Sequence, residues 1–313
     1  MKCIYHRIDA DGVASAALIK MYSDALDLNC QFIGFDYSDD FNTKVIADEE
    51  TVFIVDCSLT PGQMKELYDR ANIIWIDHHK SAIDDSFVYG YSNMKGIRFD
   101  AFAACELVHR YLLHQGYKPT IKYRFLNLIG LYDCFAGMRC DAIKDEVFEF
   151  QLGMRSLKVL TIDKMIQFLE GSFNTANDSR ATYEYVMGQG EIYKDFLTDQ
   201  AREAYDKGLT KYYNDKKCLL YSGDRLNLAN YLDEDDLDLF DFLVNYDNAI
   251  GGRGTVSLYS TKIDVSVIAK EFNGGGHKGA SGIPKDRADA FISLYLKDKL
   301  SISSSSSEDL LFS

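Results

Sequence analysis

The sequence is short of positive charge, and this shortage bears on which ligands it can bind. Its 313 residues include 34 Lys and Arg against 48 Asp and Glu, which gives a formal net charge of −14. Proteins that hold long nucleic acids use basic stripes that neutralise several phosphates at once. The acidic balance therefore argues against long duplex nucleic acid as a partner, and it fits the binding of cations by carboxylates.

The chain also lacks a cysteine framework and long apolar runs. Its seven cysteines are odd in number, scattered and without a CxxC pair, which argues against a disulfide scaffold and a structural zinc site. No apolar stretch is long enough to cross a bilayer, and the opening MKCIYHRIDADG reaches charged residues before any long apolar run, unlike a signal peptide. We therefore expect a cytoplasmic protein without membrane contact.

The first half of the chain contains alternating strand-like and helix-like segments. Short apolar runs at 2–6, 31–37, 51–58 and 72–77 are typical of strands, and segments with helical periodicity lie between several of them. Strands that alternate with helices predict a parallel sheet covered on both faces. We assign residues 1–150 to this α/β domain.

The second half of the chain has a different pattern. Residues 151–213 predict a helical connector, since the sequence from about residue 120 to 212 reads as mostly helical. Strands and helices return over 214–300, which predicts a second, smaller α/β domain. The serine-rich tail 301–313 is expected to be disordered. A length of 313 residues suits two domains of common size.

Metal-binding side chains follow three of the predicted strands. The residues concerned are His6, Asp9, Asp11, Asp56, Asp77, His78 and His79. Because parallel sheets bind ligands beyond the carboxyl ends of their strands, we expect all seven at one edge. Carboxylates this close repel one another unless a cation lies between them. Imidazole with carboxylate favours Mn²⁺, Fe²⁺, Co²⁺ or Zn²⁺, and the donors outnumber the needs of one ion, which predicts a two-metal site.

Each of these fragments has an ordinary structural interpretation when it is taken alone. A single histidine at a strand end more often faces solvent, and a single DADG more often forms a turn. Three such fragments at three strand ends are hard to produce by chance. The metal site is therefore the stronger interpretation.

A glycine-rich segment near the C-terminus forms a second candidate site. NGGGHKGASG spans residues 273–282 and contains His277 and Lys278. Consecutive glycines allow positive φ angles and close approach to a ligand, and successive N–H groups can form an anion-binding nest. A flexible loop is the ordinary interpretation of such a run.

HRIDADGVASA, VDCS, DHH and GGGHKGASG together resemble the motifs of the DHH/DHHA1 phosphoesterase family. That family includes nanoRNA-degrading phosphodiesterases, the single-strand exonuclease RecJ, cyclic-dinucleotide phosphodiesterases and, more distantly, family II pyrophosphatases. The resemblance extends from Met1 to about residue 299. It implies a parallel-sheet DHH domain joined by a helical segment to a smaller α/β DHHA1 domain. The motifs are specific for the superfamily and only weakly specific for the substrate.

The resemblance implies roles for individual residues and two divalent metal ions, with Mn²⁺ favoured. The residues that resemble the ligands of the first ion are His6, Asp9 and Asp56. Those that resemble the ligands of the second ion are Asp11, Asp56, His78 and Asp133, with Asp56 bridging. Asp77 would orient a histidine, and His79 would face the substrate phosphate as a hydrogen-bond donor or proton shuttle. The step of three from His6 to Asp9 differs from the four-residue step of many relatives.

The resemblance also implies substrate contacts in the second domain. The contacts expected in and beside the GGGH motif are Gly275, Gly276, His277 and Lys278. Relatives usually carry an arginine at the position of Tyr259. A tyrosine cannot clamp a phosphate with two hydrogen bonds, but it can stack on a base. Arg253, slightly upstream, is the alternative source of the missing charge.

The sequence favours a two-metal phosphodiesterase that hydrolyses short oligonucleotides or small nucleotides with a metal-activated water. A phosphomonoesterase, a polyphosphate hydrolase or a cyclic-dinucleotide hydrolase of the same superfamily is the close alternative. A non-catalytic nucleotide-binding sensor is the alternative from another class, and the complete set of metal-binding residues argues against it. The preference for RNA or DNA and the oligomeric state, a homodimer included, stay open.

Overall fold

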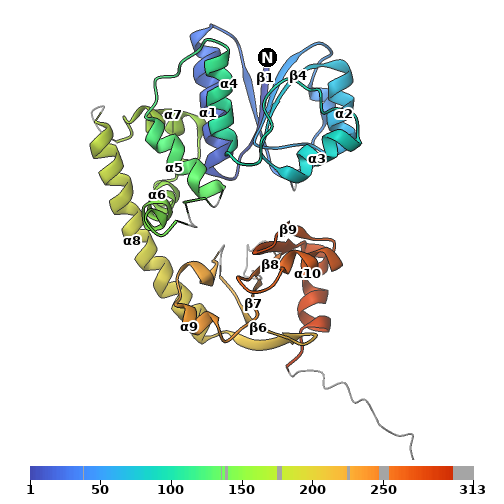
Figure 1. Ribbon diagram of the computed structural model, residues 1–313, viewed down its shortest axis with the longest axis vertical. Helices are drawn as coiled ribbons and strands as arrows, with labels where there is room; N and C mark the ends of the chain where they lie inside the picture. The colour runs from blue at the N-terminus through green and yellow to red at the C-terminus, as the bar shows by residue number, and fades with distance from the viewer. Residues whose placement is uncertain are drawn as a thin grey trace, which may run out of the picture. The chain divides into compact units, whose positions relative to one another are not determined.

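The computed structural model describes residues 1–37, 39–134, 136–137, 140–174, 178–223, 226–246 and 254–298. The chain divides into two compact units, Met1–Tyr193 and Lys194–Ser313. Figure 1 shows the elements of each unit along the chain. Arg253, the side chain of His277 and the predicted tail at 301–313 lie outside the described part.

The first unit contains the predicted parallel sheet. Its strands are β1 (Lys2–His6), β2 (Gln31–Phe35), β3 (Thr51–Val55) and β4 (Asn72–Ile76). They pair in parallel in the order β2-β1-β3-β4. The α/β class predicted from the sequence is therefore confirmed, and all four strands end at the same edge.

Helices cover both faces of this sheet because alternate strand residues are apolar on both sides (Figure 1). In β1, Cys3 belongs to one core cluster and Ile4 to the other. The helices that contribute to the Cys3 cluster are α1 (Ala10–Ala25), α4 (Ala104–His114), α5 (Tyr123–Asp133), α6 (Lys144–Ser156), α7 (Ile162–Glu170) and α8 (Ser179–Asp206). Those on the other side are α2 (Pro61–Arg70) and α3 (Lys80–Val88).

The local sequence explains where the helices next to the strand ends begin. Asp9 caps α1, because its side chain accepts a hydrogen bond from the Gly12 backbone N–H group. Thr60 and Gln63 form a capping box at the start of α2, where proline occupies the first turn. Position 12 has to be glycine, since a Cβ atom there would lie 2.0 Å from the carbonyl oxygen of His6. This close approach holds the start of α1 against the end of β1.

The second unit contains a mixed sheet, in the order β5-β6-β7-β8-β10-β9. Its strands are β5 (Leu209–Tyr213), β6 (Lys216–Tyr221), β7 (Phe242–Tyr246), β8 (Val256–Tyr259), β9 (Gly275–His277) and β10 (Ala280–Ile283). β6 and β7 are parallel, and the other pairs are antiparallel. The short helices are α9 (Glu234–Leu237), α10 (Val265–Glu271) and α11 (Lys285–Ala290), followed by the π-helical turn η4 (Phe291–Tyr295).

Two features of this region differ from the sequence-based expectations. Residues 209–213 form strand β5, although they fall almost entirely in the stretch that was expected to be mostly helical. The strand forms because it pairs with β6 across a tight turn at Asn214, which adopts a positive φ of 54°. The glycine run is not a loop throughout: Gly275–His277 pair with β10 as the edge strand β9. Among the helices of the described part, none is long and apolar enough to cross a bilayer.

Candidate metal centre

The carboxyl edge of the first sheet brings together side chains from four parts of the chain. His6 ends β1, Asp56 directly follows β3, and His78 follows β4 by two residues. Asp9 and Asp11 come from the cap and first turn of α1, and Asp133 is the last residue of α5. The structure therefore gathers all six residues that were expected to bind metal.

His6 lies between two carboxylates. Its Nδ1 atom is 2.7 Å from Asp9 Oδ2 and 3.7 Å from Asp56 Oδ2. One ligand atom from each of these three residues lies within 4.8 Å of the others, which is close enough for them to share an ion. This group is the set that was expected for the first metal ion.

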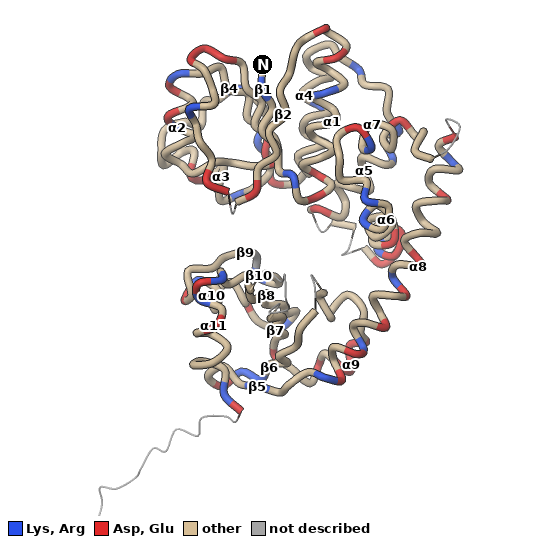
Figure 2. Tube along the Cα trace, turned by 180° about the vertical axis from the view of Figure 1, so that it is seen from behind, with Lys and Arg blue, Asp and Glu red and all other residues tan. Residues whose placement is uncertain are grey.

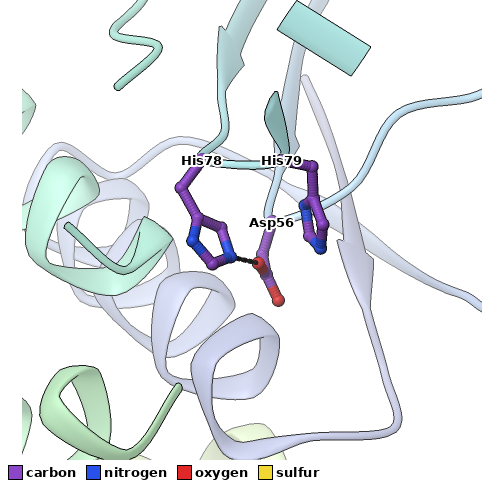
Figure 3. Close-up of side chains that lie close together, drawn as sticks. All are labelled: Asp56, His78 and His79. Carbon is purple, nitrogen blue, oxygen red and sulfur yellow. Dashed lines mark ion pairs between the residues drawn. The ribbon is translucent and has the colours of Figure 1, made fainter. Parts of the chain in front are cut away.

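His78 occupies the other side of Asp56, and Figure 3 shows the Asp56 carboxylate between the two neighbouring imidazoles of the DHH motif. The Nε2 atom of His78 is 3.3 Å from Asp56 Oδ1 and 3.2 Å from Asp133 Oδ2. It is also 3.7 Å from Asp11 Oδ2. The three carboxylates that were expected to bind a second ion together with His78 therefore converge on its Nε2 atom.

Asp56 has no hydrogen-bond donor of its own in the described structure. The residue is 1% exposed, and neither carboxylate oxygen accepts a hydrogen bond. Its backbone is held at a positive φ of 55°, with its N–H group donating 3.0 Å to the carbonyl of Ile76. A buried carboxylate without donors is costly unless a cation or a proton neutralises it. The observation fits a metal ion on either side of Asp56.

The pKa values of these residues also show that the buried carboxylates lack enough positive charge around them. Burial alone would lower the pKa of His6, but the carboxylates of Asp56 and Asp9 outweigh it and raise this pKa to about 10. Burial also opposes the charge on His78, whose pKa rises to about 10 through Cys134 and the charges of Asp11 and Asp133. Burial and then the charge of Asp11 raise the pKa of Asp56 well above its usual value. The raised pKa values reflect a shortage of positive charge that bound cations would relieve.

Asp11 differs from the other acids because both of its oxygens already accept hydrogen bonds. Oδ2 accepts from the backbone N–H of Ala104 at 2.8 Å, and Oδ1 accepts from Cys105 at 2.7 Å. These N–H groups belong to the first turn of α4, where a helix favours negative charge. Asp11 therefore fastens α4 to α1, in addition to lying beside His78.

Asp77 is fully buried and organises the DHH motif from behind. Its Oδ1 atom accepts hydrogen bonds from the backbone N–H groups of His78 at 2.7 Å and His79 at 3.2 Å. The same oxygen lies 2.7 Å from His79 Nδ1, and Oδ2 accepts from the Trp75 indole at 3.2 Å. A carboxylate can only accept, so the Nδ1 atom of His79 carries a proton and Nε2 is directed elsewhere. Asp77 therefore holds the His79 imidazole in place, and its orienting role in catalysis stays a prediction.

Residues 3–131 match the N-terminal domain of the DHH family. The chain therefore contains the N-terminal domain of the DHH family. The matched region contains the first sheet except for Lys2, and it ends just before Asp133. The assignment of Asp133 to the metal centre therefore depends on the geometry described above, in which its buried Oδ2 atom faces His78.

Solved structures share the fold of this DHH protein. RecJ from Thermus thermophilus in complex with Mn²⁺ is 13% identical, with a TM-score of 0.51 over 93% of this chain and 50% of that chain. The protein thus spans half of the RecJ chain, and at this identity the likeness shows the fold alone.

Two further structures are similar over nearly the whole chain. A pGpG-specific phosphodiesterase from Vibrio cholerae is 13% identical, with a TM-score of 0.48 over 93% of this chain and 96% of that one. An exopolyphosphatase-related protein from Bacteroides fragilis is 16% identical, with a TM-score of 0.48 over 93% and 89%. No curated protein matches the DHH protein in sequence.

In the second unit, the strand register places most of the expected substrate contacts next to one another. Ala280 of β10 pairs with Tyr259 on one side and with His277 on the other. Gly276 has a φ of 138°, and a Cβ atom there would lie 2.6 Å from the carbonyl of Ala280. Lys278 is exposed in the turn between β9 and β10. These positions stay candidates for substrate binding in the DHH protein.

Two residues of the centre were not predicted from the sequence. Cys134 directly follows Asp133, and its Sγ atom lies 3.9 Å from His78 Nδ1, so it forms a possible metal group with both. Tyr37 follows β2, and the centre of its ring lies 5.6 Å from that of His6 and 6.2 Å from that of His79. The position of Tyr37 at a strand end was the available signal, because β2 ends at the same edge as β1, β3 and β4.

Proposed function

We propose that this DHH protein is a two-metal phosphodiesterase that hydrolyses short oligonucleotides or related small nucleotides. The observation that carries the proposal is the Asp56 carboxylate. It is buried, lacks hydrogen-bond donors and lies between His6 and His78. Two cations that share this carboxylate would remove the electrostatic conflict.

The residues of the centre suggest how the work is divided. His6 and Asp9 would hold one ion with Asp56. Asp11, His78 and Asp133 would hold the other with the same Asp56 carboxylate. Such ions supply an acidified water and neutralise the phosphoryl oxygens. The mixed imidazole and carboxylate donors favour Mn²⁺ over Mg²⁺.

His79 is the residue that we assign to the substrate phosphate. Asp77 holds its Nδ1 atom, which fixes the ring and leaves Nε2 for a phosphoryl oxygen or a leaving oxygen. A hydrogen-bond donor placed before the reaction contributes most when its orientation is already fixed. The pair therefore serves phosphate binding better than it serves metal binding.

The distribution of charge favours a short substrate. Lys and Arg positions are interspersed with Asp and Glu positions in both units (Figure 2). Several of these cations form pairs within one helix, as Lys20 does with Asp24 and Arg70 with Glu66. Lys and Arg side chains that are already paired with carboxylates neutralise fewer phosphates, so a long nucleic acid would release fewer counterions on binding. The contacts expected at Gly275, Gly276, His277, Lys278 and Tyr259 belong to the same proposal.

Turnover assays with purified protein test the proposal. We expect Mn²⁺-dependent hydrolysis of di- to pentanucleotides, no hydrolysis after chelation, and slower turnover per end on a long single strand. Asp56→Asn should be inactive. Asp69→Asn is a matched control, because Asp69 is exposed on α2 and pairs only with Lys65 among the described ion pairs.

The alternatives give different results in the same assay. Hydrolysis restricted to pyrophosphate or polyphosphate would support a phosphoanhydride hydrolase, and hydrolysis restricted to cyclic dinucleotides would support that narrower activity. Equally fast, processive degradation of a long strand would support a RecJ-like exonuclease. Tight nucleotide binding without turnover in any metal would contradict the proposal and favour a sensor.

A further inference from the structure

Tyr37 extends across the carboxyl edge of the first sheet. It lies two residues beyond the end of β2, and its hydroxyl oxygen accepts a hydrogen bond of 3.4 Å from the backbone N–H of Ser58, beyond β3. Strand β1 lies between β2 and β3. The side chain therefore crosses the end of β1, beside His6.

Neighbouring rings fix Tyr37 without burying it. Phe35, which is buried, packs edge-on against it with ring centres 5.5 Å apart, and His79 approaches edge-on at 6.2 Å. Tyr37 nevertheless remains 53% exposed. An aromatic ring that is held in place and open to solvent loses little conformational freedom when a ligand covers it.

The hydroxyl group anchors the ring and does not need to ionise. The contact with Ser58 uses an oxygen lone pair. The chemistry of the ring itself is therefore the main contribution that Tyr37 can make to a ligand.

We propose that the exposed face of Tyr37 is the platform on which the nucleobase next to the scissile phosphate stacks. This inference rests on the phosphodiesterase function proposed above. A phosphate held by the metal centre and His79 would place the neighbouring base beside the Tyr37 ring, which contacts both His6 and His79. Every base has a π face, so such a platform selects nucleotides over base-free phosphates and tolerates different bases.

The platform and a purely supporting role make different predictions. If the ring only keeps His6 and His79 in place, its removal should slow all substrates equally and should weaken metal binding. If the ring binds a base, its removal should affect only substrates that carry a base at that position. Substrates that differ in a single base therefore separate the two roles.

The test compares a dinucleotide with two analogues that lack the base on one or the other side of the phosphate. We expect Tyr37→Ala to lower kcat/KM on the intact dinucleotide by about 5- to 150-fold, mainly through KM. Wild type and Tyr37→Ala should hydrolyse one of the two abasic analogues at the same rate. The base that this analogue lacks is the one that stacks on Tyr37. Tyr37→Phe keeps the ring and should retain most of the preference for a base.

Tyr89→Ala is the matched control, because Tyr89 is 51% exposed at the end of α3. It should leave all rates unchanged. Equal slowing of intact and abasic substrates by Tyr37→Ala, or loss of bound Mn²⁺, would overturn the platform.

If wild type cleaves no dinucleotide, the proposed function is contradicted, and the stacking role of Tyr37 is then tested by measuring ligand binding. A nucleoside monophosphate should then bind more tightly than inorganic phosphate to wild type, and Tyr37→Ala should remove that difference.

Discussion

One oxygen of Asp77 serves both the backbone and the side chain of the DHH motif, because it accepts two backbone N–H groups and lies 2.7 Å from His79 Nδ1. The position of the His79 imidazole is thus tied to the turn that also carries His78. A change at Asp77 should alter catalysis through His79, even though Asp77 is fully buried.

We expect Asp77→Asn to lower kcat by about 10- to 100-fold, because a residue that orients a functional histidine usually contributes this much. His79→Ala should lower kcat further. The double variant should be no worse than His79→Ala, since Asp77 acts through His79. Additive losses in the steady-state kinetics would show instead that Asp77 has a separate role, such as supporting Trp75.

Metal binding should stabilise the folded protein through Asp56. A ligand that binds only the native state raises the free energy of unfolding by about 2.7 kcal/mol at 100 times its Kd. Mn²⁺ should therefore raise the Tm of wild type, and Asp56→Asn should abolish most of this increase together with turnover. Asp69→Asn, the exposed control, should respond to Mn²⁺ as wild type does. An unchanged Mn²⁺ response in Asp56→Asn would contradict the shared position of this carboxylate.

The metal-free protein should lose stability as the pH rises. The pKa values of His6 and His78 rise from 6.5 to about 10 on folding, so their contribution is complete below pH 6.5 and is lost as the pH approaches 10. The raised pKa of Asp56 acts in the same direction. Denaturant unfolding after chelation, measured from pH 6 to 10, checks this. Mn²⁺ should flatten the profile because metal binding displaces these protons.

Cys134 should make the centre sensitive to alkylation at alkaline pH, because burial raises the pKa of its thiol and only the thiolate reacts. Its thiol lies 3.9 Å from His78 Nδ1, and it is half-buried. We expect iodoacetamide to inactivate wild type and Mn²⁺ to slow this inactivation. Cys134→Ser should resist the reagent. Cys140→Ser is the matched control, since Cys140 is the exposed cysteine, and inactivation of this variant should match wild type. Protection by Cys140→Ser instead would contradict the assignment.

The meeting of the residues of the centre at one edge of the sheet could be predicted from the sequence because the rule behind it is simple. Parallel strands end at one edge, so His6, Asp56 and His78 meet there whatever the details of packing. Asp133 is different. It enters from the end of α5, and only the family resemblance suggested it before the geometry placed it 3.2 Å from His78.

The residues that the sequence did not reveal depend on contacts between distant segments. Tyr37 stands out only once the order of strands places β1 between β2 and β3. The hydrogen bonds from the first turn of α4 to Asp11 depend on where this helix packs, 93 residues further along the chain. Strand β5 was assigned to a helical stretch because its sequence, LTKYY, has no strong period, and pairing with β6 decides its conformation.

The bond between Asp11 and α4 has a consequence for protein synthesis. Asp11 leaves the ribosome before its partners Ala104 and Cys105, which follow only after 93 and 94 further residues. Asp133 is made later still. A nascent chain thus contains the histidine and acids of β1 and α1 long before it can assemble a complete centre. Hydrolytic activity would therefore appear only after most of the first unit has been made.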